Sequence, residues 1–311
     1  MKSLFTLLAL AASAGCASTA GNTDVSCQPL TPGPATRPAG WTGTVFTIVM
    51  ENKSRAEIAG NASAPFINQL IHQGALAAGY HDPKIHPSEP NYLWMVAGQN
   101  FGVLDDRDPA SHHLASTSHL ADQLELAGLT WKTYQEDMGE PCGLVTHGRY
   151  AAKHNPFVYF DDINGWDGTS FQPSQRCIEH VVDYAQLDVD LAGTLPSYVF
   201  ITPNLVNDMH DGTIAQGDQW LKNEVPKILG SDAFKDGGVL FLLWDEGNLG
   251  RDDPPFIAIS PNAKPGFVST PDSDTSSYLL TVEKLLGVAP LPCAQDAGAT
   301  SSMDELFTVP L

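Results

Sequence analysis

The chain is poor in basic residues, and this shortage limits the partners that it can have. Its 311 residues include 16 lysines and arginines against 36 aspartates and glutamates, which gives a formal net charge of −20 at pH 7. A surface this acidic is repelled by nucleic-acid phosphates and by anionic lipid headgroups. We therefore expect no nucleic-acid partner, and an anionic substrate would need local positive charge from a metal ion or a few basic side chains.

Apolar runs long enough to cross a membrane are also absent. The one candidate, residues 4–12, follows Lys2 and precedes small residues, a pattern typical of an export signal and too short for a transmembrane span. We expect a signal peptide over residues 1–20 and a secreted or cell-envelope protein. Two modes of processing stay open: cleavage at a small-x-small site, or lipidation of Cys16, where the usual leucine of a lipoprotein box is replaced by Ser13.

Cysteine is scarce, with five in the chain. No CxxC or Cys/His spacing indicates zinc. If Cys16 is removed or lipidated, an even number remains, which suits an oxidising compartment. The pairing does not follow from the sequence, and our hypothesis is Cys142–Cys177 and Cys27–Cys293.

Common catalytic motifs are missing as well, including G-x-S-x-G, the P-loop, H-E-x-x-H and G-x-G-x-x-G. What the chain does contain is a regular alternation of apolar strands and amphipathic helices after a Pro/Thr/Gly-rich linker at residues 17–40. The pattern predicts strands at 44–50, 129–137, 197–204, 237–247 and 254–261 and helices at 64–74, 116–128, 218–229 and 275–287. We expect capping by Ser or Thr at 116–118 and a kink or break at Pro226. Such alternation is typical of an α/β fold with a mainly parallel sheet, here as one domain over residues 41–311.

Polar residues follow three of the predicted strands. Glu51-Asn52 follows the first, Asp245-Glu246 follows the most apolar one, and a segment with Asp208, His210 and Asp211 follows a third. Because the carboxyl ends of parallel strands share one edge of the sheet, we expect these groups to converge. The four oxygen donors Glu51, Asn52, Asp245 and Glu246 would then repel one another without a cation. The alternative for Asp245-Glu246 is a solvated turn before Gly247.

A second feature is the segment "HPSEPNYLWMVAG" at residues 86–98, in which two prolines bracket Ser88-Glu89. A serine just ahead of a buried helix gains from the free amides of the helix N-terminus, which stabilise an alkoxide or a phosphate. The alternative is a simple N-cap, the common role of such serines. His86, His154 and His210 lie in loops that contain proline or glycine, whereas His72, His112, His113, His119 and His180 have no such signal.

Six motifs in this order, "VMENKS", "HPSEPNYLWMVAG", "WKTYQEDM", "YAAKHNPFVYF", "NDMHDG" and "LLWDEG", resemble the phosphoesterase family. That family includes secreted acid phosphatases and bacterial phospholipases C within the alkaline phosphatase superfamily. The resemblance covers residues 43–290. It implies a three-layer α/β/α sandwich around a mainly parallel sheet, in agreement with the strand and helix pattern.

The resemblance also implies roles for individual residues. It assigns one divalent metal ion, of unknown identity, to Glu51, Asn52, Asp245 and Glu246, in contact with the nucleophile Ser88. It makes His86, His154 and His210 phosphate-contacting and proton-transferring groups, and adds Asn91 to the substrate contacts. Asp208 and Asp211 are both candidates to orient His210. Protonated histidines would complete the positive charge and favour an acidic pH optimum.

The short chain is most similar to the secreted acid phosphatases, some of which act on phosphoinositides. We therefore expect an exported phosphate monoesterase whose partner is a small phosphorylated substrate or a phospholipid headgroup. A phospholipase C-like phosphodiesterase is the alternative. A binding lipoprotein that has lost its chemistry is a third hypothesis, although Ser88 and the four ligand candidates are all present.

Overall fold

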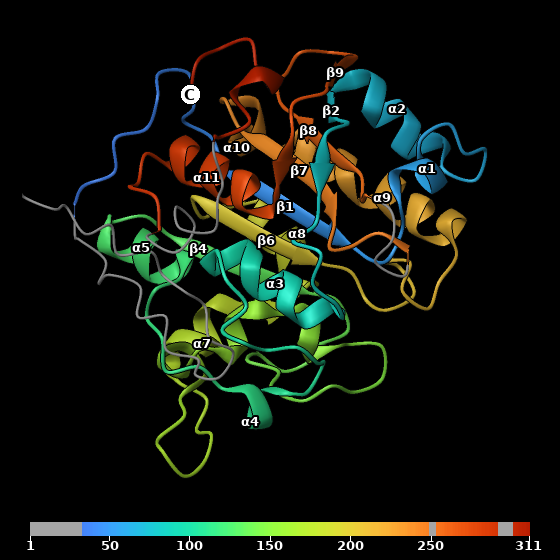
Figure 1. Cartoon of the computed structure of the whole chain (residues 1–311). Coiled ribbons are helices and arrows are strands. Elements are labelled where there is room, and N and C mark those ends of the chain that lie inside the picture. The colour runs from blue at the N-terminus through green and yellow to red at the C-terminus, as the bar shows by residue number, and fades with distance from the viewer. Residues whose placement is uncertain (1–32, 249–252, 292–300) are drawn as a thin grey trace, which may run out of the picture.

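A single eight-stranded sheet forms the centre of the computed structural model, which describes residues 33–248, 253–291 and 301–311. The strand order is β5-β4-β6-β1-β7-β8-β2-β9 (Figure 1). The strands are β1 Val45–Met50, β2 Ala75–Ala77, β4 Trp131–Gln135, β5 Val181–Asp183, β6 Tyr198–Thr202, β7 Val239–Trp244, β8 Phe256–Ile259 and β9 Phe267–Ser269. Among these strands only β8 runs antiparallel to its neighbours, so the expected mainly parallel sheet is confirmed.

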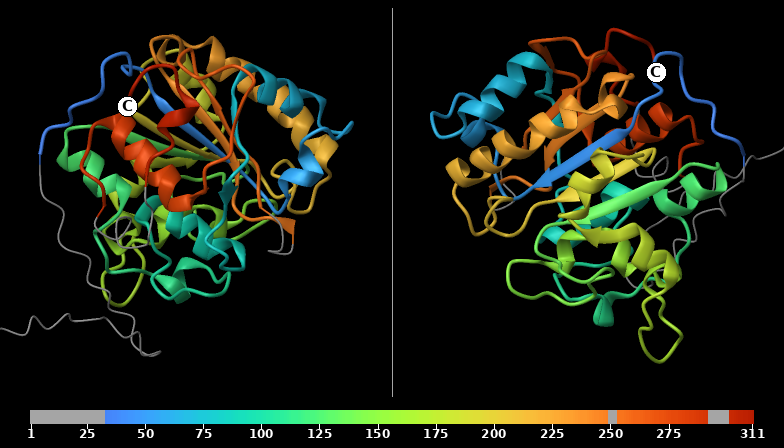
Figure 2. Two further views of the ribbon diagram at one scale, coloured as in Figure 1. Left: turned by 45° about the horizontal axis from the view of Figure 1, so that its top comes forward. Right: turned by 180° about the vertical axis from the view of Figure 1, so that it is seen from behind.

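Helices cover both faces of the sheet (Figures 1 and 2). On one face lie α3 (Ser88–Ala97), α5 (Leu120–Leu126) and α11 (Thr275–Leu286), and on the other α2 (Pro65–Gln73) and α9 (Ile214–Gly230). Successive side chains of β1 point to opposite faces, so Val45 and Val49 join the first core while Phe46 and Ile48 join the second. The expected α/β/α sandwich is therefore confirmed.

The shorter elements connect these layers. The remaining helices are α1 Arg55–Ile58, α4 Pro109–His112, α6 Asp161–Asn164, α7 Gln175–His180, α8 Gln186–Leu191 and α10 Asp232–Lys235, with 3-10 turns at Ala152–His154, Pro156–Tyr159 and Asp304–Leu306. A small separate sheet pairs β3 (Tyr80–His81) with β10 (Ser273–Asp274).

Two sequence predictions about helices were wrong in detail. Of the kink or break predicted at Pro226, the break does not occur, because α9 continues through this residue to Gly230. Leu221 and Val225 on its buried face pack into the second core, and this burial offsets the hydrogen bond that proline cannot make. The predicted helix at 116–128 begins only at Leu120, and its cap is the imidazole of His119 rather than a Ser or Thr.

Part of the expected linker contacts the folded part of the chain. The amide of Thr36 donates to the Gly287 carbonyl over 2.8 Å, and the Arg37 guanidinium donates to the carbonyls of Gly43 and Leu285. None of the helices within the described ranges is long and apolar enough to cross a membrane.

One of the two expected disulfide bonds is present. Cys142, in the loop after β4, bonds to Cys177 of α7, with their Cα atoms 5.2 Å apart. Cys16, Cys27 and Cys293 lie outside the described residues, so the second pairing and the lipidation of Cys16 stay predictions.

Candidate active site

The carboxyl ends of three neighbouring strands form the candidate site. β1 lies between β6 and β7, and Met50 pairs in register with Trp244. The residues that follow these two, Glu51 and Asp245, are therefore side by side at the edge of the sheet. The backbone amide of Asn52 donates to Asp245 Oδ1 over 3.2 Å, which fixes the two strand ends to each other.

Glu51 and Asp245 concentrate negative charge in a buried place. Both side chains are fully buried. Burial and the nearby carboxylates raise the pKa of Glu51 and of Asp245 well above the usual range. Asp245 Oδ2 is buried and has no hydrogen-bond partner in the described part of the chain. A cluster of this kind gains stability from a cation, and its oxygen donors suit a divalent metal ion.

Glu246, the fourth expected metal ligand, faces a different group of residues. Its Oε2 accepts a hydrogen bond from Asn91 Nδ2 over 3.3 Å and also contacts His86 Nδ1. The structure thus groups Glu246 with His86 and Asn91, two of the expected substrate contacts, and groups Asn52 and Ser88 with Glu51.

Ser88 occupies the first position of α3 rather than a position ahead of it. The N-cap is Pro87, so the Ser88 hydroxyl does not cap the helix, and the simple N-cap interpretation is wrong. Ser88 Oγ instead donates to Glu51 Oε2 over 3.1 Å. The next amide, of Glu89, donates to Asp106 Oδ1 over 3.0 Å. The hydroxyl is thereby placed between a buried carboxylate and a helix N-terminus.

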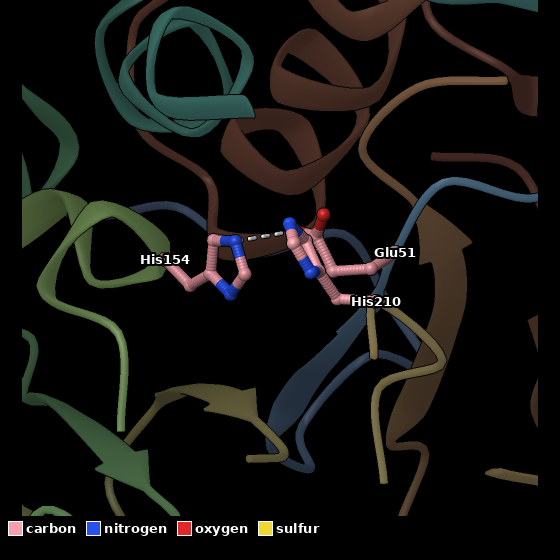
Figure 3. A group of neighbouring side chains, drawn as sticks. All are labelled: Glu51, His154 and His210. Atoms are coloured by element: carbon pink, nitrogen blue, oxygen red, sulfur yellow. Dashed lines mark ion pairs between the residues drawn. The ribbon is translucent and has the colours of Figure 1, made fainter. Parts of the chain in front are cut away.

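His154 lies deep in the site beside Glu51. Figure 3 shows the side chains of Glu51, His154 and His210 close together, with His154 Nε2 3.1 Å from Glu51 Oε1. The His154 ring stacks on Tyr92, whose hydroxyl donates to the same carboxylate over 2.7 Å. Burial and the neighbouring Lys153 lower the pKa of His154 well below its usual value. This shift disfavours the positive charge that was expected of His154.

Asp211 and Asp208 contact different parts of His210. Asp211 Oδ1 lies 2.7 Å from Nδ1 of the His210 ring, whereas Asp208 Oδ1 accepts the backbone N–H of His210 over 2.7 Å. Asp208 Oδ2 also lies 3.3 Å from Nδ1 of His154. Burial raises the pKa of Asp208 to about 7. Of the two candidates, Asp211 is the acid that contacts the His210 ring.

A second place for a cation lies between the residues of Figure 3. Glu51, His154 and His210 each offer one ligand atom, and these atoms lie within 4.8 Å of one another. Imidazole nitrogens with a carboxylate form a ligand set that transition metals accept. The carboxylate of Glu51 belongs to both this group and the group with Asp245.

Sequence reasoning missed a cation in the site, Lys153. Its ammonium donates to Asp106 Oδ2 over 2.8 Å and lies 3.2 Å from His210 Nε2. Burial opposes this charge, but the hydrogen bond to Asp106 and the field of Glu51 raise the pKa of Lys153, so the ammonium stays charged. The available signal was its place directly before His154 in "KHNPF". Lys153 supplies local positive charge within the site.

Comparisons with known proteins support the expected family. The model of the phosphoesterase family matches residues 60–250. The phosphatidylinositol-3-phosphatase of Mycobacterium tuberculosis is 34% identical over 248 residues, which are 78% of this chain and 77% of that protein. The acid phosphatase of Aspergillus fumigatus is 29% identical over 240 residues, which are 74% of this chain and 51% of that protein. The chain thus spans about half the length of this fungal relative. The hydrolase class expected from the sequence agrees with the names of these relatives.

Solved structures show the same fold. A protein of the alkaline phosphatase superfamily from Vibrio parahaemolyticus aligns with a TM-score of 0.55 at 12% identity, over 84% of this chain and 70% of that one. The phosphonate monoester hydrolase of Silicibacter pomeroyi aligns with a TM-score of 0.54 at 10% identity, over 86% of this chain and 76% of that one. The motifs, the fold and the family match lead to one conclusion: the chain belongs to the phosphoesterase family.

Proposed function

We propose that this chain is an exported, metal-dependent phosphatase that hydrolyses phosphate monoesters through a phosphoserine on Ser88. The observation that carries the proposal is the contact of Ser88 Oγ with Glu51 Oε2 at 3.1 Å, at the N-terminus of α3. A hydroxyl in this place has a carboxylate to accept its proton and lies at a helix N-terminus, whose partial positive charge attracts an anionic phosphate.

The buried acids support the metal part of the proposal. The pKa values of the buried carboxyl groups of Glu51 and Asp245 are raised, so a cation bound beside them would stabilise their ionised forms. Asp245 Oδ2, which has no hydrogen-bond partner in the described part of the chain, could ligate such a cation. The Asn52 amide lies 3.1 Å from Glu51, and a half-turn of this amide would present its oxygen to the same ion. Glu246 would join through its carboxylate. A divalent cation bound here would lower the pKa of the Ser88 hydroxyl and neutralise phosphoryl oxygens.

The remaining residues would bind the phosphate and move protons. Ser88 Oγ attacks phosphorus, the bond to the alcohol oxygen breaks, and water later displaces phosphate from the serine. Nδ1 of His210 contacts Asp211, and Nε2, which lies 3.2 Å from the Lys153 ammonium, is the ring nitrogen that would exchange a proton with the leaving group. His154, His86 and Asn91 would contact the phosphoryl oxygens.

Phosphate monoesters are the proposed substrates because of the relatives' names. The relatives reported above are named a phosphatidylinositol-3-phosphatase and an acid phosphatase, and these names support a phosphatase acting on monoesters rather than a phosphodiesterase. Among monoesters we propose phosphoinositides as one class. Export is supported by the N-terminal apolar run and by the Cys142–Cys177 bond, which suits an oxidising compartment.

The test is hydrolysis of p-nitrophenyl phosphate, bis(p-nitrophenyl) phosphate and phosphatidylinositol 3-phosphate by wild type and Ser88→Ala. We expect the monoesters to be preferred and Ser88→Ala to lose roughly 1,000-fold or more in kcat. A matched control is Ser118→Ala, another buried serine, two residues before α5. Equal activity of Ser88→Ala would contradict the proposed nucleophile, and preference for the diester would favour the phosphodiesterase alternative.

A further inference from the structure

Two residues of the site have a left-handed backbone although neither is glycine. Asn52 has φ 52° and Met209 has φ 82°. Asparagine adopts this conformation fairly readily, but a long side chain such as that of methionine adopts it rarely. Asn52 is an expected metal ligand, and Met209 directly precedes His210. The backbone conformation at Asn52 therefore sets the direction of its own side chain, and the conformation at Met209 sets the position of His210.

One side chain holds both strained residues. The ammonium of Lys53 donates to the Met209 carbonyl over 2.9 Å and to the Asn52 carbonyl over 3.2 Å. Met209 is fully buried, and Lys53 is half-buried. Hydrogen bonds from a charged donor are stronger than neutral ones, especially when water is excluded from one side.

Acids of the site hold backbone N–H groups of the same two turns. The N–H of His210, in the peptide that begins with the Met209 carbonyl, donates to Asp208 Oδ1 over 2.7 Å. The N–H of Asn52 donates to Asp245 Oδ1 over 3.2 Å. Acids therefore fix the N–H groups, and Lys53 fixes the carbonyl groups of the two turns.

A backbone hydrogen bond also joins the two turns, close to the contacts of Lys53. The amide of Glu51 donates to the carbonyl of Asp208 over 2.8 Å, one residue before the contact of Lys53 with Met209. The Lys53–Met209 hydrogen bond is a further link between the end of β1 and the loop after β6. Without it the loop that carries His210 would be tied to β1 by the Glu51–Asp208 bond and by side chains that also serve the site.

We propose that Lys53 is a positioning residue that holds Asn52 and His210 in register across the site. This inference rests on the proposed function, because it assigns to Lys53 the geometry on which phosphate hydrolysis depends. Removal of the ammonium lets either turn relax toward negative φ, which rotates the Asn52 amide and the His210 ring away from Ser88. Lys53 itself does not contact the reacting atoms.

A graded series of substitutions tests the role of the ammonium. Lys53→Arg keeps a charged donor for two carbonyls, Lys53→Gln keeps a neutral donor, and Lys53→Met keeps only the apolar stem. We expect kcat to fall roughly 10- to 100-fold in Lys53→Met, less in Lys53→Gln and least in Lys53→Arg. KM for p-nitrophenyl phosphate should change roughly threefold or less, because the phosphate contacts remain. Lys222→Met, at an exposed lysine of α9, is the matched control for loss of one charge.

A second measurement separates this inference from the proposed function. Hydrogen exchange of the segment 205–213 should be faster in Lys53→Met than in wild type or Lys222→Met, whether or not the protein hydrolyses phosphate. Inactive wild type would contradict the proposed function while leaving the exchange test in place. Unchanged kcat and unchanged exchange in Lys53→Met would overturn the positioning role, and so would a loss in Lys53→Arg equal to that in Lys53→Met. If Lys53→Met does not fold, the order of Lys53→Arg and Lys53→Gln decides the same question.

Discussion

The His210 ring and the Asp211 carboxylate face each other at 2.7 Å, although they are adjacent in the sequence. Asp208, the other acid of this loop, instead accepts the His210 backbone N–H and approaches the ring of His154. One loop of the chain thus orients two histidines with two different acids. Asp211 is more than half exposed, whereas Asp208 is fully buried, so the two contacts differ in how much water weakens them.

Replacement of each acid by its amide should show this difference. In Asp211→Asn we expect kcat to fall roughly threefold to tenfold, because an exposed contact orients His210 only weakly. In Asp208→Asn the loss should approach roughly 100-fold, since both His154 and the loop backbone lose a carboxylate. Steady-state kinetics with p-nitrophenyl phosphate measure both, and thermal unfolding shows whether the variants are folded. A larger loss in Asp211→Asn would contradict this assignment.

Metal removal should affect both activity and stability. Without a cation, Glu51 and Asp245 are held close together in a buried place, so chelation should abolish hydrolysis and lower Tm. A metal present at 100 times its Kd stabilises the folded state by about 2.7 kcal/mol, and re-addition of Mg, Mn, Ca, Fe or Zn should restore Tm to different extents. In the control Asp245→Asn the added metal should raise Tm less. An identical Tm with and without metal in wild type would argue against the site.

Asn52→Asp tests why the metal site includes a neutral amide. The Asn52 side chain lies 3.1 Å from Glu51 Oε2, so an aspartate here would add a fourth carboxylate to Glu51, Asp245 and Glu246. We expect the variant to keep its metal but to lose roughly tenfold or more in kcat, because added negative charge weakens the pull of the metal on Ser88 and repels the phosphate. Metal analysis and kinetics check the two parts. Asn223→Asp, on the exposed face of α9, controls for the added charge.

The sequence predicts the centre of the site because of a simple rule of parallel sheets. Within these predicted strands, residues 45–50 and 239–244 are apolar apart from Thr47, which is typical of strands buried on both faces. Strands of this kind end at one edge of the sheet, so the polar residues that follow them must meet. The structure places Glu51 and Asp245 next to each other for this reason, although they lie far apart in the chain.

The parts that the sequence did not predict depend on tertiary contacts without a local pattern. Asp106 lies in an irregular loop after α3, and only the folded chain brings it to Lys153 and to the amide of Glu89. The strands β2, β5 and β9 have three residues each, too few for a period-two pattern to appear. The lowered pKa of His154 follows from the burial of its ring, which stacks on Tyr92, and the sequence does not reveal this burial.

Lys153→Met should weaken substrate binding more than folding. The Lys153 ammonium lies 3.2 Å from His210 Nε2 and is the charged group that would attract a phosphoryl oxygen. We expect kcat/KM to fall roughly 10- to 100-fold, with part of the activity kept in Lys153→Arg. Lys132→Met is a matched control, because Lys132 of β4 forms a similar ion pair with Asp190. An equal effect of the two methionine variants would show that the loss of an ion pair, and not its place, matters.

Glu283 should make folding stability depend on pH far from the site. It lies in α11, accepts the Leu291 amide over 2.7 Å, and its Oε2 is buried without a hydrogen-bond partner in the described ranges. Burial raises the pKa of Glu283 to about 8 from an ordinary value of 4.5. The folded state therefore keeps a proton that the unfolded chain releases, so this stabilisation is complete below about pH 4.5 and is lost as pH rises toward 8.

Glu283→Gln removes this titration while it keeps an oxygen that can accept the Leu291 amide. Between about pH 4.5 and pH 8 the unfolding free energy of wild type should fall relative to the variant by up to about 1.4 kcal/mol per pH unit. Urea unfolding of both proteins at pH 5, 6.5 and 8 measures the difference. The exposed Glu140→Gln should show no such trend. A difference between Glu283→Gln and wild type that is the same at all three pH values would mean that Glu283 is ionised in the folded protein.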